Sequence, residues 1–295
     1  MKLHEDGRRL AGLGAAGTAR VLSVTVRFER GRWFASFTAE TEAGRPVPRR
    51  PDAVVGVDLG VKTLAALSAG EEIPNPRHLS GALRKLRRLS RAVSRRRGPG
   101  RRTGQKPSNR WRRASTALGK AHGRVADQRK DGLHKLTTRL AAEFGTVVIE
   151  DLNAAGTVKN RHLARHVADA SFGEFRRQLE YKAAWHGGRV IIADRWFASS
   201  KTCSGCGAVK AKLLLSERTY CCTACGLVLD RDANAALNLA GYGNRQIAGS
   251  GPEIPNGRGA GRKTPPRAQV AVKRQPGTRK HGQTGTVPPQ EGTAA

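Results

Sequence analysis

Two Cys-x2-Cys pairs constrain the fold of this chain more than any other feature. Cys203 and Cys206 form the first pair, Cys222 and Cys225 form the second, and fifteen residues separate the two pairs. This spacing is typical of a two-knuckle zinc ribbon, in which four thiolates surround one ion. Because four thiolates leave zinc no open coordination position, the sequence predicts a structural zinc.

The fifth cysteine, Cys221, lies outside both pairs, and we expect it to take no part in metal binding. An odd number of cysteines within one short segment favours metal over disulfides. Buried free cysteines or a redox pair are the alternatives. Gly207 and Gly226 each follow a pair directly, which suits the tight turn of a zinc knuckle.

Three acidic residues stand in contexts where an unpartnered charge would be costly or unusual. Asp58 lies inside the apolar run VVGVDLG, Glu150 ends the apolar run TVVIE, and Asp232 begins a helical pattern directly after the second cysteine pair. A buried ionised carboxylate needs a partner, and a metal ion is one. The alternative roles are a hairpin turn for Asp58, a strand edge for Glu150 and helix capping for Asp232, with Asp230 as the rival cap.

The hydrophobic pattern predicts a mixed α/β chain. Residues 21–40 suggest two strands around a turn, and residues 51–69 suggest a hairpin that contains Asp58. A helix is expected from 79 to 97, where Gly98-Pro99-Gly100 breaks it, and a second one from about Trp111 to Gly145. A strand at 146–150, a helix at 171–187 and a strand at 189–194 follow.

Charge points to a polyanionic partner. The chain carries 54 Lys and Arg against 23 Asp and Glu, a net charge of +31, and residues 81–113 contain no acid at all. No apolar stretch approaches the roughly 18 to 20 residues of a membrane-spanning helix, so DNA or RNA is favoured over a membrane. A solvated helix face is the alternative for this run. The residues that we expect to contact nucleic acid are Arg84, Lys85, Arg87, Arg88, Arg91, Arg95, Arg96, Arg97, Arg101 and Arg102.

Several motifs together resemble the OrfB/TnpB family of transposon proteins, which are RNA-guided nucleases akin to type V CRISPR effectors. They are GVDLGVKTLAALS, VVIEDLN, RWFASSKTCSGCG and CTACGLVLDRDANAALNLA, and the likeness extends over about residues 21–242. The resemblance implies a RuvC nuclease of RNase H-like fold with Asp58, Glu150 and Asp232 as catalytic triad. It also implies a zinc ribbon at the four paired cysteines, and a bacterial, cytoplasmic, nucleoid-associated protein.

The resemblance also implies how the chain is divided. Residues 1–50 would be the remnant of an N-terminal β domain, because family members carry a longer N-terminal region with helical recognition elements. The nuclease core would span 51–201 with a basic helical insertion at 79–144, the ribbon 202–226, and the last core helix 227–242. The Gly- and Pro-rich residues 243–295 are expected to form a disordered basic tail.

The expected function is a transposon-associated DNA endonuclease that hydrolyses phosphodiesters with two Mg²⁺ ions at its three carboxylates. Its partners would be DNA and, in the intact family, a guide RNA. One alternative is a catalytically idle DNA- or RNA-binding protein that regulates transposition. Another is a DDE-type transposase, which the ribbon between the last strand and the third acid disfavours.

Overall fold

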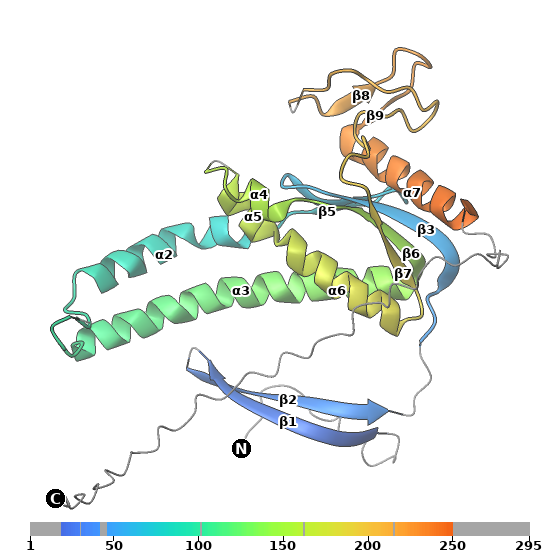
Figure 1. Cartoon of the computed structure of the whole chain (residues 1–295). Coiled ribbons are helices and arrows are strands. Elements are labelled where there is room, and N and C mark those ends of the chain that lie inside the picture. Colours follow the sequence, from blue (N-terminus) through green and yellow to red (C-terminus); the bar gives the residue numbers. More distant parts are fainter. Residues whose placement is uncertain are drawn as a thin grey trace, which may run out of the picture. The chain divides into compact units, whose positions relative to one another are not determined.

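A five-stranded mixed sheet forms the centre of the computed structural model, which describes residues 19–29, 31–41, 46–100, 102–161, 163–214 and 216–249 (Figure 1). The strand order is β5-β4-β3-β6-β7. Strands β3, β4 and β5 are antiparallel in turn, whereas β6 and β7 run parallel to β3. The strands are β3 (Arg50–Leu59), β4 (Thr63–Leu67), β5 (Glu72–Pro74), β6 (Phe144–Glu150) and β7 (Arg189–Ala193).

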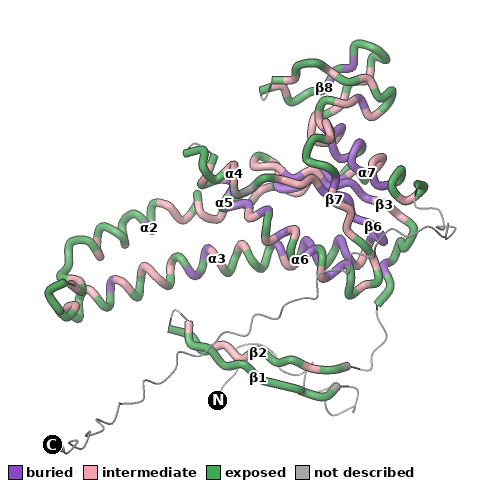
Figure 2. Tube along the Cα trace, in the orientation of Figure 1, coloured by how far each residue is buried: buried purple, intermediate pink, exposed green. Residues whose placement is uncertain are grey.

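Helices cover both faces of this sheet. On one face Val57 and Ile149 pack into the main core with Leu140 and Phe175, which come from helices α3 and α6. On the other face Val148 packs against Leu239 of helix α7. Neighbouring residues of a strand point to opposite faces, so stretches buried on both sides are apolar, as residues 55–57 of β3 and 147–149 of β6 are. Figure 2 shows the resulting concentration of buried residues in these strands. The three helices are α3 (Asn109–Glu143), α6 (Phe172–Trp185) and α7 (Arg231–Gly249).

Helix α7 lies directly on the backbone of β3 because Gly56 has no side chain. A Cβ atom at Gly56 would overlap the carbonyl oxygen of Ala236 and approach the Cβ atom of Leu239 to 2.9 Å. Gly243 makes a similar close approach from the helix side, against Val148 of β6. Two glycines therefore set the distance between α7 and the strands that carry Asp58 and Glu150.

A long helical hairpin extends from the sheet and carries the basic run (Figure 1). Its arms are α2 (His78–Ser94) and α3, and Ser108 caps α3 by accepting a hydrogen bond from the backbone N–H of Trp111. The base of α2 is held by Asp169, a buried acid that accepts a hydrogen bond from the backbone N–H of Leu79 and pairs with Arg129 at 2.8 Å. The hairpin is thus anchored at its sheet end.

The remaining elements are short or form two-stranded sheets. β1 pairs with β2, and β8 pairs with β9, both antiparallel. Large apolar residues of the first pair, such as Phe28 and Trp33, are exposed in the described chain. These elements are β1 (Ala19–Glu29), β2 (Arg32–Thr41), β8 (Thr219–Cys221), β9 (Val228–Asp230), α4 (Ala154–Thr157) and α5 (Ala164–Ala170).

The predicted strands at 21–40, 51–69, 146–150 and 189–194 and the helix at 171–187 are confirmed. Other boundaries were wrong. α2 ends at Ser94 instead of residue 97, Phe144 begins β6 instead of ending a helix, and residues 243–249 continue α7 instead of starting a tail. Residues 250–295 lie outside the described residues, and β5, α4 and α5 were not predicted. Within the described ranges, no helix is long and apolar enough to cross a membrane.

Candidate functional site

Asp58 and Glu150 face the same side of the sheet at neighbouring positions. The parallel register pairs Val57 with Ile149, so the next residues along β3 and β6 are Asp58 and Glu150. Side chains alternate along a strand, and Asp58 shares its face with Gly56 while Glu150 shares its face with Val148. Both carboxylates therefore lie on the face that α7 covers.

The first turn of α7 supplies the third acid. Asp230, the last residue of β9, caps this helix: its Oδ1 atom accepts hydrogen bonds from the backbone N–H groups of Asp232 and Ala233 at 2.8 and 3.2 Å. Asp230 is therefore the cap of α7, and the Asp232 carboxylate is not used for capping. Its one ion pair among the described residues is with Arg231, at 3.6 Å.

Glu150 and Asp232 act electrostatically on Asp58. The pKa of Asp58 is raised from its ordinary value of 3.8 to about 8, first by burial and then by the negative charges of Glu150 and Asp232. Arg231 opposes this rise only in part. Without a cation, the site therefore favours a protonated Asp58 at neutral pH, whereas a bound cation would favour its ionised form.

A serine that the sequence did not single out contacts the second acid. The Ser199 hydroxyl donates a hydrogen bond to Oε1 of Glu150, and Ser199 is only 2% exposed. It lies in the segment between β7 and the first cysteine pair. Two asparagines of α7, Asn234 and Asn238, bind the same segment. The only sequence signal was the motif RWFASSKTCSGCG, which gave no chemical reason to choose Ser199.

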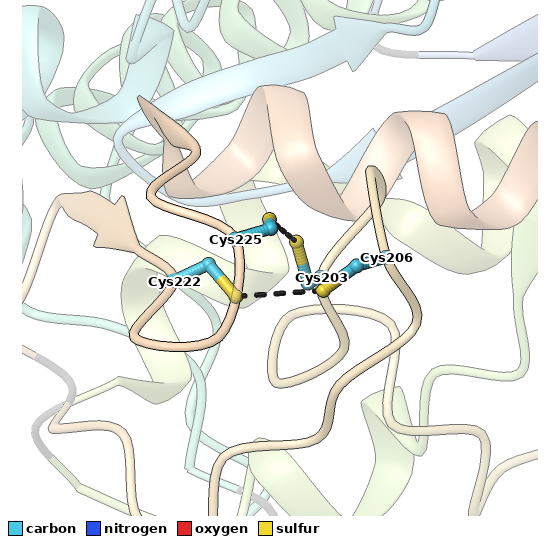
Figure 3. Close-up of side chains that lie close together, drawn as sticks. All are labelled: Cys203, Cys206, Cys222 and Cys225. Carbon is cyan, nitrogen blue, oxygen red and sulfur yellow. Dashed lines mark hydrogen bonds between the residues drawn. The ribbon is translucent and has the colours of Figure 1, made fainter.

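Four cysteines come together at the ribbon (Figure 3). Their Sγ atoms all lie within 4.8 Å of one another, and the distances Cys203–Cys225 and Cys206–Cys222 are both 3.6 Å. The group could hold a metal ion. Cys221 is outside this group. In the described part of the chain no other group of three metal-ligating side chains is as close, and the three acids do not form one.

Each cysteine pair lies at the tip of its own hairpin. A bridge between Thr202 and Val209 closes the first hairpin, and β8 and β9 close the second. The residues that follow the pairs, Gly207 and Gly226, have φ angles of +77° and +75°, which glycine adopts without strain. Backbone N–H groups of Cys225 and Ala224 lower the pKa of Cys222 to about 6, which favours its thiolate.

The basic residues expected to bind nucleic acid are exposed along α2 and the turn after it, except Arg101, which lies outside the described residues. Four of them line an open groove of about 810 Å³. No described acid forms an ion pair with these four, which are Arg84, Lys85, Arg88 and Arg91. Their charge is therefore available to an anionic partner.

Two family models match separate parts of the chain. The model described as "Probable transposase", of the OrfB type, matches residues 36–161, which include Asp58 and Glu150. The model described as "Cas12f1-like, TNB domain" matches residues 172–239, which include the four paired cysteines and Asp232.

Curated relatives agree with these models. A "Putative RNA-guided DNA endonuclease" of Streptomyces pristinaespiralis is 43% identical over 226 residues, which are 76% of this chain and 54% of the relative. A protein of the same description from Mycobacterium tuberculosis is 40% identical over 280 residues, 90% of this chain and 58% of the relative. One from Escherichia coli is 34% identical over 257 residues, 82% of this chain and 61% of the relative.

The chain thus spans between 54% and 61% of the length of these relatives. Relatives described as TnpB-like, from Acanthamoeba polyphaga mimivirus, are 33% identical over 142 residues. Because the two models together match the regions of the three acids and the cysteine ribbon, and these relatives are 33% to 43% identical to the chain, it belongs to the OrfB/TnpB family of transposon proteins.

Proposed function

We propose that this chain is the nuclease part of a transposon-associated, RNA-guided DNA endonuclease. The observation that carries the proposal is the convergence of Asp58, Glu150 and Asp232, from β3, β6 and α7, on one face of the sheet. The relatives named above, which are described as RNA-guided DNA endonucleases, support the same activity.

The core would be of the RNase H-like RuvC class. Support comes from the mixed sheet, in which an antiparallel hairpin carries the first acid and a parallel neighbour carries the second. The third acid lies at the start of helix α7, which packs across both strands. This order of elements agrees with the fold that the motifs imply.

Mg²⁺ ions fit the carboxylate site. Oxygen ligands are those that Mg²⁺ prefers, and a bound cation would offset the burial and the neighbouring negative charges that raise the pKa of Asp58. Two divalent ions about 4 Å apart would activate water and stabilise the leaving oxygen of a phosphodiester. In this proposal Asp58, Glu150 and Asp232 hold the ions, and Asp230 keeps the helix that carries Asp232 in place.

Zinc fits the four-cysteine group. With Zn–S bonds of about 2.3 Å, tetrahedral geometry requires sulfur atoms about 3.8 Å apart, close to the 3.6 Å observed for two pairs. The ion would be structural, since four thiolates occupy every position.

DNA and a guide RNA are the proposed partners, and the groove along α2 is the proposed contact surface. Its arginines and lysine lie along one stretch of helix and lack acidic partners in the described chain. Phosphate contacts of this kind hold a strand without reading its sequence. Base pairing to a guide would then supply the sequence recognition.

Asp58→Ala and Glu150→Ala test the proposal. Each should abolish Mg²⁺-dependent cleavage of single-stranded DNA, while DNA affinity changes little because other residues contact phosphate. Asp131→Ala is the matched control, since Asp131 is exposed and, among the described residues, pairs only with Lys135 on α3. Cleavage by either site variant at the rate of the unmodified chain would refute the assignment.

A further inference from the structure

One short segment connects the carboxylate site to the cysteine group. Residues 199–204 follow β7 and lead into the first cysteine pair. At one end, the Ser199 hydroxyl donates to Glu150. At the other end, Cys203 belongs to the four-cysteine group that could hold a metal ion. Only three residues therefore separate Ser199, which contacts an acid, from Cys203, a proposed ligand of zinc.

Two buried asparagines of α7, one helical turn apart, form hydrogen bonds to this segment through their side-chain amides. Nδ2 of Asn238 donates to the carbonyl oxygens of Ser199 and Thr202, at 2.8 and 2.7 Å. Nδ2 of Asn234 donates to the carbonyl of Thr202 at 2.7 Å, and its Oδ1 accepts from the backbone N–H of Ser204 at 2.9 Å. These contacts surround Cys203 on both sides along the chain. The same helix carries Asp232, two residues before Asn234.

These polar residues occupy positions where packing alone would favour apolar ones. Asn234 is 0% exposed and Asn238 is 9% exposed, and both are flanked on the helix by buried Ala235, Ala236 and Leu239. A buried amide that loses its hydrogen-bond partners destabilises the fold by about 1–3 kcal/mol. Such an amide therefore stabilises the fold only where the geometry provides those partners. Satisfied buried networks fix one arrangement of the elements that they join.

We infer that Ser199, Asn234 and Asn238 are positioning residues that couple the ribbon metal to the carboxylate site. Ser199 orients Glu150, the two asparagines fix the helix of Asp232, and all three contacts depend on a segment that Cys203 ties to the ribbon. A metal in the ribbon thereby sets the geometry in which the acids bind their own ions. This inference rests on the proposed function, since it needs a divalent-ion site at the acids.

Mn²⁺ binding to the full chain, followed by the electron paramagnetic resonance of free Mn²⁺, tests the first half of the inference. Ser199→Ala and Asn238→Leu should each weaken Mn²⁺ binding about tenfold, as loss of an outer hydrogen bond to a metal ligand does, while zinc content stays unchanged. Tyr220→Phe is the matched control. It removes the hydrogen bonds that the Tyr220 hydroxyl donates to the carbonyls of Lys201 and Ala208, and within the described chain this hydroxyl has no hydrogen bond to α7 or to an acid.

Coupling must also act in reverse, because two linked sites affect each other's affinity equally. Mg²⁺ should therefore slow the removal of zinc by a chelator in the unmodified chain and in Tyr220→Phe. In Asn238→Leu and Ser199→Ala it should have little effect. A merely structural asparagine would change the rate of zinc loss without changing its response to Mg²⁺.

Asp58→Asn separates this inference from the proposed function. If Asp58→Asn leaves Mn²⁺ binding unchanged, the ions bind elsewhere and the proposed function fails. If Asp58→Asn abolishes Mn²⁺ binding but Ser199→Ala and Asn238→Leu bind Mn²⁺ normally, the function stands and the coupling is overturned. An equal effect of Mg²⁺ on zinc loss in all variants would overturn it as well.

Discussion

Asp230 accepts a hydrogen bond from the backbone N–H of Asp232 at 2.8 Å, so the two acids at the start of α7 have different roles. The cap uses the side chain of Asp230 and only the backbone of Asp232. Asp230→Ala should lower the free energy of unfolding by about 1 kcal/mol and leave cleavage measurable. Asp232→Asn should abolish Mg²⁺-dependent cleavage without a loss of stability. Thermal unfolding and a cleavage assay on both variants check this; the reverse pattern would assign catalysis to Asp230.

Asp58→Asn should stabilise the chain when no divalent ion is added. The pKa of Asp58 is about 8 in the folded chain against 3.8 as its ordinary value, so the folded state binds the proton more tightly. The contribution of protonated Asp58 to the stability of the fold is fully present below pH 3.8 and is lost as the pH rises towards 8. The variant should therefore unfold at a higher temperature than the unmodified chain at pH 8, on the order of 5 °C, and the difference should shrink towards pH 5.

Added Mg²⁺ provides the control for this effect. It should stabilise the unmodified chain by binding the ionised acids and should have little influence on Asp58→Asn. If the two chains have the same unfolding temperature at pH 8 and at pH 5 without added ions, the electrostatic account of the site is wrong.

Gly56→Ala should be strongly destabilising, because the added Cβ would overlap the backbone of α7 at Ala236. We expect a loss of more than about 2 kcal/mol, as overpacking that displaces backbone typically causes. Gly173→Ala is the matched control: Gly173 lies in α6 with no atom within 4 Å of the added Cβ. That substitution should be neutral or stabilise by up to about 1 kcal/mol. Chemical denaturation measures both, and equal stabilities would contradict the close packing of α7 on β3.

The acids could be located from the sequence because a charge in an apolar strand is a strong local signal. The register that places Asp58 beside Glu150 could not be predicted, since the 91 residues between them include the entire helical hairpin. Ser199 and Asn238 were missed for a related reason. Serine and asparagine are common in loops and helices, and only the folded chain shows that their hydrogen bonds converge on one segment.

Phe144 and Gly145 explain why one boundary was wrong. Phe144 continues the helical spacing of Leu136 and Leu140, and glycine commonly ends helices, so a stop at Gly145 was a reasonable prediction. In the fold Gly145 is a strand residue, and the carbonyl of Pro51 occupies the place where its Cβ would be. The glycine is required by a close contact with β3, which no local pattern reveals.

Elemental analysis of the purified chain should find one tightly bound zinc. Cys203→Ser or Cys225→Ser should lose it, because each removes one of four ligands, whereas Cys221→Ser should retain it. Cys221 is a close control, since it is adjacent in sequence to the ligand Cys222. Loss of zinc from Cys221→Ser with retention in Cys225→Ser would mean that a different set of cysteines binds the metal.

Binding to double-stranded DNA should weaken steeply with salt, and the groove along α2 should account for much of that dependence. Neutralising Arg84, Arg88 and Arg91 to Gln should reduce the slope of log affinity against log salt by about 2 to 3, since each phosphate contact contributes about 0.9. The control is the triple change of Lys135, Arg139 and Arg177 to Gln. It removes the same charge, but each of these residues already pairs with an acid. Equal slopes for the two triple variants would show that net charge alone, and not this groove, attracts the DNA.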